Sequence, residues 1–235
     1  MKTERVQKII SNNTHISRRK AEDLIREGKV RVNNETINIG ATATEKDKIE
    51  VNGDEIKKTR KTIIAIDKEK GYVTSTKDPH EKTIMKTLPQ KYKDQNLKPA
   101  GRLDKDTTGL LILTNDGDLA NWIMHPSNNI KKTYEGKTTK ELKEQDLKKL
   151  REGIKLDERI AKCEARKIND DKFEIILQTG WTRQIRRMLE AIGHEVIELR
   201  RTKIGNLNIK DLNNKPIKEY NKQELTDKIT RNTRK

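Results

Sequence analysis

The stretch GRLDKDTTGLLILTNDG spans residues 101–117 and combines a short apolar run with an unusual density of acids. The apolar residues 110–113 lie between Gly109 and Gly117, which predicts a short buried strand. Four aspartates stand within or just after the stretch: Asp104, Asp106, Asp116 and Asp118. The chain as a whole is basic, with 53 Lys and Arg against 37 Asp and Glu and a net charge of +16. An acidic cluster in such a chain requires an explanation of its own.

The composition narrows the class of protein. A length of 235 residues suffices for one large domain or two small ones, and the 3% aromatic content predicts a core of Ile, Leu and Val. The positive charge indicates a polyanionic partner, either nucleic acid or an anionic membrane surface. Apolar runs such as residues 110–113 are far shorter than the roughly 20 residues of a spanning helix. The opening MKTERVQ has no apolar signal segment, so we expect a cytoplasmic protein without a membrane partner.

Several kinds of site are not indicated. Cys163 is the single cysteine, so the sequence predicts neither a disulfide framework nor a Cys/His zinc cluster. No glycine-rich GxxxxGK loop occurs, so we expect no nucleotide cofactor.

Residues 1–60 are expected to form a small unit. Ser17 is a candidate N-cap for RRKAEDLIREG, whose apolar residues fall on one helix face and whose Gly28 can end the helix. VRVNNETINI and IEVNGDEI predict strands joined at Asn-Asn and Asn-Gly turns. The charged run KKTRKT, residues 57–62, is the expected boundary.

Residues 61–235 are expected to form a larger second unit. TIIAIDKEKGYVTST predicts two short strands around Gly71, and KKTYEGKT and FEIILQTG predict further strands. DLANWIMH, ELKEQDLKKLREG and TRQIRRMLEAIG predict helices. Because strands and helices do not alternate regularly, we predict an α+β fold with a mixed, largely antiparallel sheet flanked by helices. About the last eight residues, which end in TRNTRK, are expected to be disordered.

The helix predicted over TRQIRRMLEAIG has two faces. Its apolar residues lie on one side, and Arg183, Arg186 and Arg187 lie on the other. A solvated face is the plain interpretation, but three arginines without an interleaved acid favour contact with phosphate or carboxylate.

A second basic cluster lies on the helix and strand of the first unit: Arg18, Arg19, Lys20, Arg26, Lys29 and Arg31. It is either a solvated surface or a contact surface for structured RNA, and the sequence favours RNA read through shape and phosphates.

The acids allow three interpretations. In an extended segment Asp104 and Asp106 would share a face, and one interpretation is a metal site for phosphoryl transfer. Alternatively, one of them is a catalytic carboxylate, or all four acids cap turns and helices, which suits Asp116 and Asp118 well. Asp104 stands out because Arg102 is two residues away, and a carboxylate held by arginine stays ionised and oriented. Tyr134, in the predicted strand KKTYEGKT, is either a packing residue or a functional one.

Four blocks of the sequence carry a family resemblance. GRLDKDTTGLLILTNDGDLANWIMHP, KKTYEG, TGWTRQIRRMLEAIGHEVIELRRTKIGNL and PIKEYNKQEL follow one another in the order typical of a catalytic domain. The chain resembles the ribosomal RNA pseudouridine synthases of the RsuA/RluB/RluE/RluF family. ISRRKAEDLIREGKVRVN is similar to the S-four-type RNA-binding domain that precedes the catalytic domain in that family.

The resemblance implies roles for individual residues. Asp104 would be the catalytic aspartate, Tyr134 would pack under the target base and act as general base, and Arg186 would pair with Asp104. Arg102 would fill the gap that a flipped base leaves. Arg183, Arg187 and Trp181 would contact RNA, although Trp181 stands where the family usually has a polar residue and either stacks on RNA or packs.

The resemblance also implies a reaction and a partner. A monomer would isomerise uridine in ribosomal RNA without a metal or other cofactor. Two alternatives remain open on the residues: an RNA-binding, ribosome-associated protein without catalysis, and a metal-dependent nuclease that uses Asp104 and Asp106.

Overall fold

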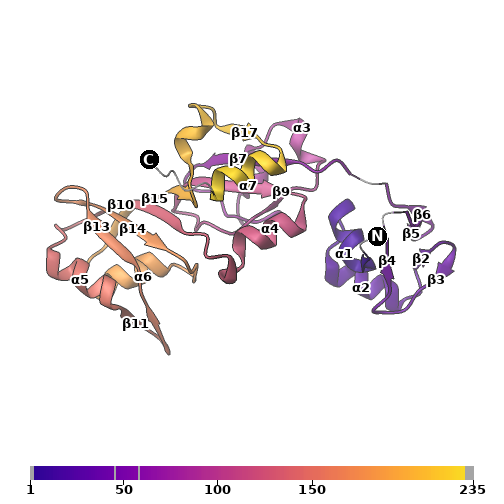
Figure 1. The fold of residues 1–235 in the computed structure, drawn as a ribbon, viewed down its shortest axis with the longest axis horizontal. Helices are drawn as coiled ribbons and strands as arrows, with labels where there is room; N and C mark the ends of the chain where they lie inside the picture. Colours follow the sequence, from indigo (N-terminus) through magenta and orange to yellow (C-terminus); the bar gives the residue numbers. More distant parts are fainter. Residues whose placement is uncertain (1–2, 45, 58, 231–235) are drawn as a thin grey trace. The chain divides into compact units, whose positions relative to one another are not determined.

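The computed structural model describes residues 3–44, 46–57 and 59–230, which fall into two compact units (Figure 1). One unit gathers the residues up to Lys61 together with Pro89–Leu97 and Asn115–Gly117. The other contains Thr62–Leu88, Lys98–Thr114 and the chain from Asp118 onward. The first unit has one apolar core and the second has two.

The N-terminal part of the first unit packs two helices against short strands. Ser17 caps α2 as predicted, because its side-chain oxygen accepts a hydrogen bond from the Lys20 N–H at 3.2 Å. Gly28 follows α2 with a φ of +67°, which glycine adopts without strain. The helix α1 was not predicted; it buries Val6 and Ile10 against α2. The helices are α1 (Val6–Asn13) and α2 (Arg18–Arg26).

The strands of the first unit are all short and pair antiparallel. They are β1 (Glu4–Arg5), β2 (Val30–Val32), β3 (Glu35–Thr36), β4 (Thr42–Ala43), β5 (Ile49–Val51) and β6 (Asp54–Glu55). β1 pairs with β4, and a separate sheet has the order β3-β2-β5-β6.

A single mixed sheet organises the second unit. Within the described residues it has nine strands, in the order β13-β14-β10-β15-β9-β7-β17, with β8 added to β9 and β16 added to β15. Only β9 and β15 pair in parallel among these strands, so the sheet is largely antiparallel, as predicted. The strands are β7 (Ile63–Lys68), β8 (Lys98–Pro99), β9 (Thr108–Thr114), β10 (Lys132–Thr138), β13 (Glu164–Lys167), β14 (Lys172–Leu177), β15 (Val196–Ile204), β16 (Leu207–Asn208) and β17 (Ile217–Glu219).

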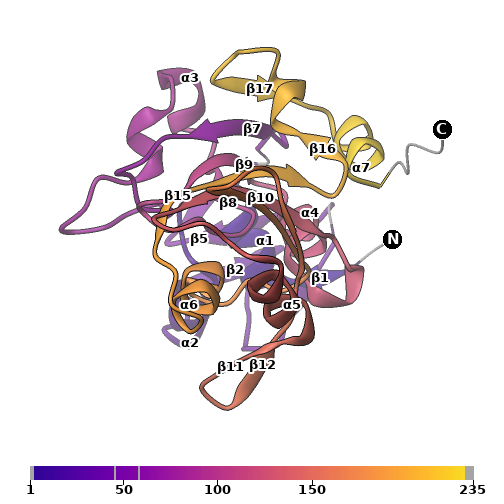
Figure 2. The ribbon, with the colours of Figure 1, turned by 90° about the vertical axis from the view of Figure 1, so that its left-hand side faces the viewer.

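Helices flank two different parts of this sheet (Figures 1 and 2). α4 (Gly117–Met124) and α7 (Lys222–Thr230) bury their apolar residues with those of β7 and β9. α5 (Glu144–Glu152) and α6 (Gln184–Glu190) pack around Phe173 of β14. The remaining elements are short: α3 (Gln90–Lys93), the 3₁₀ turns η1 (Ile84–Thr87), η2 (Pro126–Asn128) and η3 (Ile209–Leu212), and the hairpin of β11 (Ile154–Leu156) and β12 (Arg159–Ala161).

Three local expectations need correction. The second strand predicted after Gly71 does not form: Val73 makes only an isolated bridge to Thr83, and the Gly71 N–H donates to the Lys105 carbonyl at 2.8 Å. The β11–β12 hairpin was not predicted. The expected disorder at the end of the chain is wrong for residues 228–230, which belong to α7, and residues 231–235 lie outside the described residues.

One glycine permits the parallel contact at the middle of the sheet. Gly109 on β9 pairs with Arg201 on β15, at a φ of +106°. A Cβ atom at this position would lie 2.3 Å from the Arg201 carbonyl oxygen, well inside van der Waals contact. Only glycine therefore lets the two backbones approach so closely.

We predict that Gly109→Ala lowers the stability of the second unit by at least about 2 kcal/mol, because the methyl group meets backbone atoms that cannot move and φ is positive. Gly193→Ala is the matched control, since Gly193 also has a positive φ of +86° but no atom near its missing Cβ. Urea unfolding followed by tryptophan fluorescence reports on this unit, because Trp122 and Trp181 both lie in it. Equal losses of unfolding free energy in the two variants would show that the close approach of Gly109 to Arg201 does not make the substitution more destabilising.

Candidate active site

A cavity of about 510 Å³ lies within the second unit and collects several of the predicted residues. Its lining comes from the loop before β9, from β10 and β15, and from the segment that leads into α6. The predicted residues that line it are Arg102, Asp104, Tyr134, Trp181 and Arg183. Arg201, which the sequence analysis did not single out, lines it as well.

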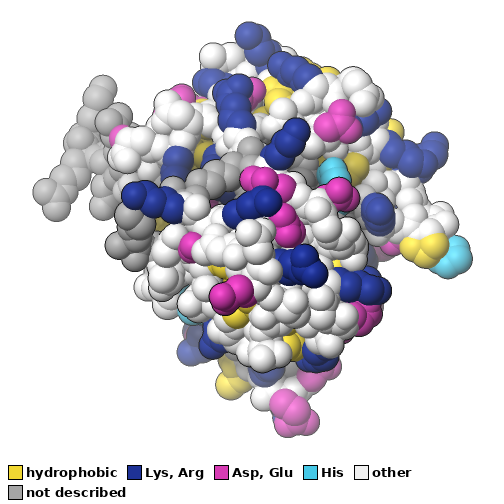
Figure 3. Space-filling model, turned by 90° about the vertical axis from the view of Figure 1, so that its right-hand side faces the viewer, with side chains coloured by type: hydrophobic (Ala, Val, Ile, Leu, Met, Phe, Trp, Pro, Cys, Tyr) yellow, Lys and Arg dark blue, Asp and Glu magenta, His cyan; other side chains and the backbone are white. Residues whose placement is uncertain are grey.

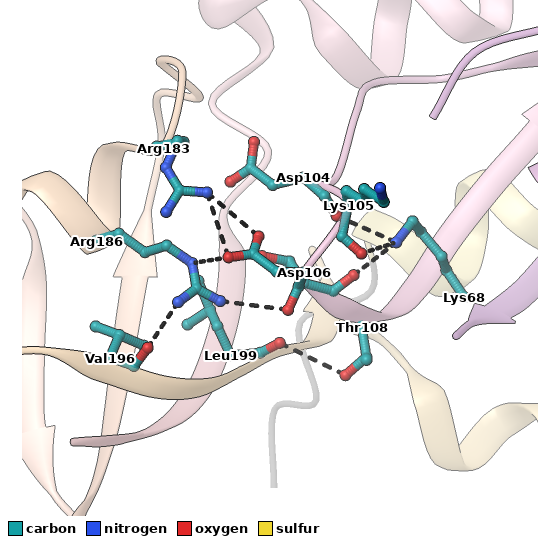
Figure 4. Close-up of polar contacts among 10 residues, drawn as sticks. Lys68, Asp104, Lys105, Asp106, Thr108, Arg183, Arg186, Val196 and Leu199 are labelled. Atoms are coloured by element: carbon teal, nitrogen blue, oxygen red, sulfur yellow. Dashed lines mark hydrogen bonds and ion pairs between the residues drawn. The ribbon is translucent and has the colours of Figure 1, made fainter. Parts of the chain in front are cut away.

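The loop that carries Asp104 is anchored by a buried lysine (Figure 4). The Lys68 ammonium, at the end of β7, donates to the carbonyl oxygens of Thr107 at 2.8 Å and of Asp104 at 3.1 Å. It also donates to the carbonyls of Glu69 at 3.1 Å and Lys105 at 3.5 Å. The side chain of Lys68 is fully buried. Four backbone acceptors thus replace the water that this ammonium loses on burial.

Burial lowers the pKa of Lys68 from its ordinary value of 10.5 to about 8, although the carboxylates of Asp106 and Asp104 oppose this shift. The sequence analysis overlooked Lys68. Its only signal is its position two residues after the apolar run IIAI of a predicted strand.

Asp106, rather than Asp104, forms ion pairs with Arg183 and Arg186 at the start of α6. Arg183 Nη1 lies 3.3 Å from Asp106 Oδ2, and Arg186 Nε lies 3.2 Å from the same oxygen (Figure 4). Arg186 also donates to the Asp106 carbonyl at 3.3 Å and to the Val196 carbonyl at 2.7 Å. The resemblance implied an ion pair between Arg186 and Asp104, and this prediction is wrong because Arg186 pairs with Asp106.

A turn explains the change of partner. The Thr107 N–H donates to the Asp104 carbonyl at 3.1 Å, so residues 104–107 form a turn and not an extended segment. Asp104 and Asp106 consequently do not share a face, as an extended strand would have required. Asp106 meets α6, while Asp104 lines the cavity.

The Asp104 carboxylate is uncommitted. Within the part of the chain that the structure describes, no hydrogen bond or ion pair engages it, and its side chain is half-buried. Its backbone, by contrast, is fixed by Lys68 and by the turn. A fixed backbone and a free carboxylate suit a group that reacts with a bound substrate.

Tyr134 and Arg201 face one another across β10 and β15. They are register partners, and Arg201 Nη1 lies 3.5 Å from the Tyr134 hydroxyl oxygen. The guanidinium carbon lies 6.0 Å from the centre of the Tyr134 ring. Tyr134 is half-buried and presents its ring to the cavity lining.

The other predicted contact residues divide into two groups. Trp181 is half-buried with the Arg159 guanidinium 5.6 Å from its ring centre, and Arg102 is exposed at the cavity. Arg187 is not part of the cavity lining, because it pairs with Asp157 of the β11–β12 hairpin at 2.7 Å. The structure thus separates Arg187 from Arg183 and Arg186.

The six basic residues that were predicted to contact RNA in the first unit are all exposed: Arg18, Arg19, Lys20, Arg26, Lys29 and Arg31. Two of them have acidic neighbours, since Arg26 pairs with Asp23 at 3.0 Å and Lys29 with Glu27 at 2.6 Å. Figure 3 shows Lys and Arg side chains spread over the face drawn there, with acidic side chains between them.

The described residues contain neither a metal-binding cluster nor a membrane-spanning helix. No group of three or more His, Cys, Asp or Glu side chains is arranged to hold a metal ion. Nor does any described helix have the length and apolar character to cross a membrane.

Comparisons with known proteins agree on the family. Residues 62–191 match the RNA pseudouridylate synthase family, and residues 4–49 match the S4 domain. The chain is 38% identical to the ribosomal large subunit pseudouridine synthase B of Bacillus subtilis (strain 168), over 94% of each protein. It is 34% identical to the dual-specificity RNA pseudouridine synthase RluF of Escherichia coli (strain K12), over 95% of this chain and 76% of the relative. A crystal structure of a pseudouridylate synthase superposes with a TM-score of 0.69 at 26% identity, covering 94% of this chain and 98% of the other.

We predict that Lys68 makes stability rise with pH. Between about pH 8 and 10.5 the folded protein loses the Lys68 proton while the unfolded chain keeps it, so rising pH favours folding. Relative to Lys68→Met, the wild-type protein should gain up to about 3 kcal/mol across this window. Urea unfolding of both proteins at several pH values measures the difference. A wild-type free energy of unfolding that does not rise relative to that of Lys68→Met over this window would show that burial does not lower the pKa of Lys68.

Proposed function

The chain belongs to the RNA pseudouridylate synthase family, as the resemblance predicted, and we propose that it isomerises a uridine of ribosomal RNA in the cavity around Asp104. The observation that carries the assignment of the site is an uncommitted carboxylate on an anchored loop, in a cavity that Arg102, Arg183 and Arg201 also line. The name of the Bacillus subtilis relative makes large-subunit RNA the first substrate to test.

The chemistry requires one carboxylate and a bound base. The N1–C1′ bond of uridine breaks, the uracil turns, C5 bonds to C1′, the proton leaves C5 and N1 gains a proton. Atoms and electrons balance within the nucleotide, so the proposal includes no nucleotide cofactor and no metal. Asp104 either attacks C1′ or takes a proton from the ribose, and both routes need an ionised, well-placed carboxylate.

The surrounding residues take supporting roles in this proposal. The Tyr134 ring packs under the base and its hydroxyl serves as the general base, while Arg102 fills the gap that the flipped nucleotide leaves. Trp181 and Arg183 contact the RNA at the cavity. Arg186 is a positioning residue, because it acts on the catalytic loop through Asp106 and its carbonyl. Arg187 contacts RNA only if its pair with Asp157 opens.

The first unit supplies affinity in this proposal. Its match to the S4 domain and its exposed basic residues support contact with RNA phosphates. The proposal also includes a monomer that acts on ribosomal RNA in the cytoplasm.

We predict that Asp104→Asn abolishes detectable pseudouridine formation while RNA binding persists, because the amide keeps the size but is neither nucleophile nor base. Asp106→Asn should slow the reaction by about 10²-fold without abolishing it, because the loop loses its pairs with Arg183 and Arg186 and shifts. Tritium release from a large-subunit rRNA fragment with 5-tritiated uridine measures both rates.

Binding and thermal melting of the same variants serve as controls. Normal tritium release by a folded Asp104→Asn protein would refute the catalytic assignment. Cleavage of the RNA that stops with chelator would favour a metal-dependent nuclease. Tight binding without turnover by the wild-type protein would favour an RNA-binding protein without catalysis.

We also predict that the first unit binds phosphates through Arg19 and Lys20. The double variant Arg19→Gln/Lys20→Gln should lower the slope of log Kd against log salt by about 1.4 to 1.8, or 0.7 to 0.9 for each lost contact. Arg26→Gln/Lys29→Gln is the matched control, with a smaller expected change because both side chains already pair with acids. Equal slopes for the wild-type protein and the Arg19/Lys20 variant would remove these residues from the RNA interface.

A further inference from the structure

Arg201 is a buried cation that lacks a full set of partners. Its residue is only 4% exposed, although it lines the cavity. Nε donates to the Leu110 carbonyl at 2.8 Å, and Nη1 reaches the Arg102 carbonyl at 3.4 Å and the Tyr134 hydroxyl at 3.5 Å. Nη2 is buried and has no hydrogen-bond partner among the described residues. A guanidinium carries five N–H donors, and an unsatisfied buried donor is costly.

The charge of Arg201 is also uncompensated. Among the ion pairs of the described residues, none joins Arg201 to a carboxylate. Its nearby charges include the cation Lys132, whose pKa is lowered by burial and further by Arg201. A buried charge without a partner is strongly unfavourable. An arrangement of this kind, beside a cavity of nucleotide dimensions, indicates that the missing acceptor arrives with the ligand.

The backbone fixes where this donor lies. The contact between Gly109 and Arg201 holds β15 against β9, and Nε is bound to the first residue after Gly109. Tyr134, proposed to lie under the target base, is the register partner of Arg201 on β10. The guanidinium is therefore oriented before the RNA binds, and a hydrogen bond from this buried cation to a ligand oxygen is charge-assisted and strong.

We propose that Arg201 contacts the target nucleotide, with Nη2 donating to one of its oxygen atoms while Nη1 orients the Tyr134 hydroxyl. The proposal rests on the proposed function, because it places the flipped uridine in this cavity. The oxygen belongs either to a uracil carbonyl or to the phosphate of the same nucleotide. Both are hydrogen-bond acceptors, and the experiment distinguishes them.

The main variant is Arg201→Met, which keeps much of the apolar stem but removes every donor. Arg200→Met is the matched control: Arg200 is the neighbouring arginine on β15, and it pairs with Asp67 at 2.5 Å outside the cavity lining. Both full-length variants are compared with wild type for single-turnover rate and for affinity. The RNA is a large-subunit rRNA fragment that the wild-type protein modifies, with the target uridine either present or replaced by an abasic ribose.

Arg201→Met should lower the single-turnover rate on saturating RNA by about 10²-fold, whereas Arg200→Met should stay near wild type. Contact with a uracil carbonyl predicts that Arg201→Met weakens binding of the uridine RNA but not of the abasic RNA. Contact with phosphate predicts weaker binding of both RNAs and a salt slope lower by about 0.7 to 0.9. A wild-type rate and affinity for folded Arg201→Met would overturn the proposal.

A second variant covers the case in which Arg201→Met does not fold. Arg201→Lys retains a cation but loses the fork that serves Leu110, Tyr134 and the nucleotide together, so its rate should fall while its melting temperature stays close to wild type. Wild-type turnover by Arg201→Lys would overturn the need for Nη2. If the wild-type protein modifies no uridine in the RNA, the proposed function fails. The contact between Arg201 and RNA is then tested by affinity alone. Equal RNA affinities of Arg201→Met and Arg200→Met would refute that contact.

Discussion

The backbone contact between Gly109 and Arg201 determines how the second unit is assembled. β7 and β9 form one antiparallel group with β17, and β10, β14 and β13 form another with β15. Among the described strands, the two groups pair with each other only where β9 runs parallel to β15. The loop with Asp104 immediately precedes this contact in the chain, and Arg201 lies within it. A close approach that only glycine allows thus brings an acid and a cation from distant parts of the sequence to one cavity.

The acids at this site have different electrostatic roles. Asp106 compensates Arg183 and Arg186, and four carbonyl groups solvate Lys68. Asp118 lies in the first turn of α4, where a negative charge is favourable. Asp104 alone of the acids in the loop before β9 remains uncommitted and lines the cavity. The density of aspartates in residues 101–118 therefore reflects one candidate catalytic group and several structural ones.

Local signals in the sequence predicted much of the fold. Ser17, the apolar run 110–113 and the two-faced helix with Arg183, Arg186 and Arg187 each carry their signal within a few residues, and the structure contains a cap, a strand and a helix there. The irregular order of elements also predicted the mixed sheet. The β11–β12 hairpin was missed because its strands are three residues each and Ile160 is largely exposed.

The parts of the site that could not be predicted depend on long-range geometry. The partner of Arg186 is decided by the turn over residues 104–107, which moves Asp104 and Asp106 to different sides. Lys68 resembles any surface lysine in sequence, because its acceptors are backbone carbonyls up to 39 residues away. Arg201 could not be predicted either, because the missing partner of its Nη2 depends on which strands lie beside β15. Family resemblance pointed to Asp104 and Tyr134, which both line the cavity, but the partner it implied for Arg186 differs from the one in the structure.

The anchoring of the loop by Lys68 has a consequence for redesign. Every hydrogen-bond acceptor of Lys68 belongs to the main chain, so these hydrogen bonds do not use the side chains at positions 104, 105 and 107. A glutamate, cysteine or histidine installed at position 104 would inherit the same backbone placement and the same empty space in front of it. The reactive side chain at position 104 can consequently be exchanged for other nucleoside chemistry while the backbone hydrogen bonds of the loop are retained.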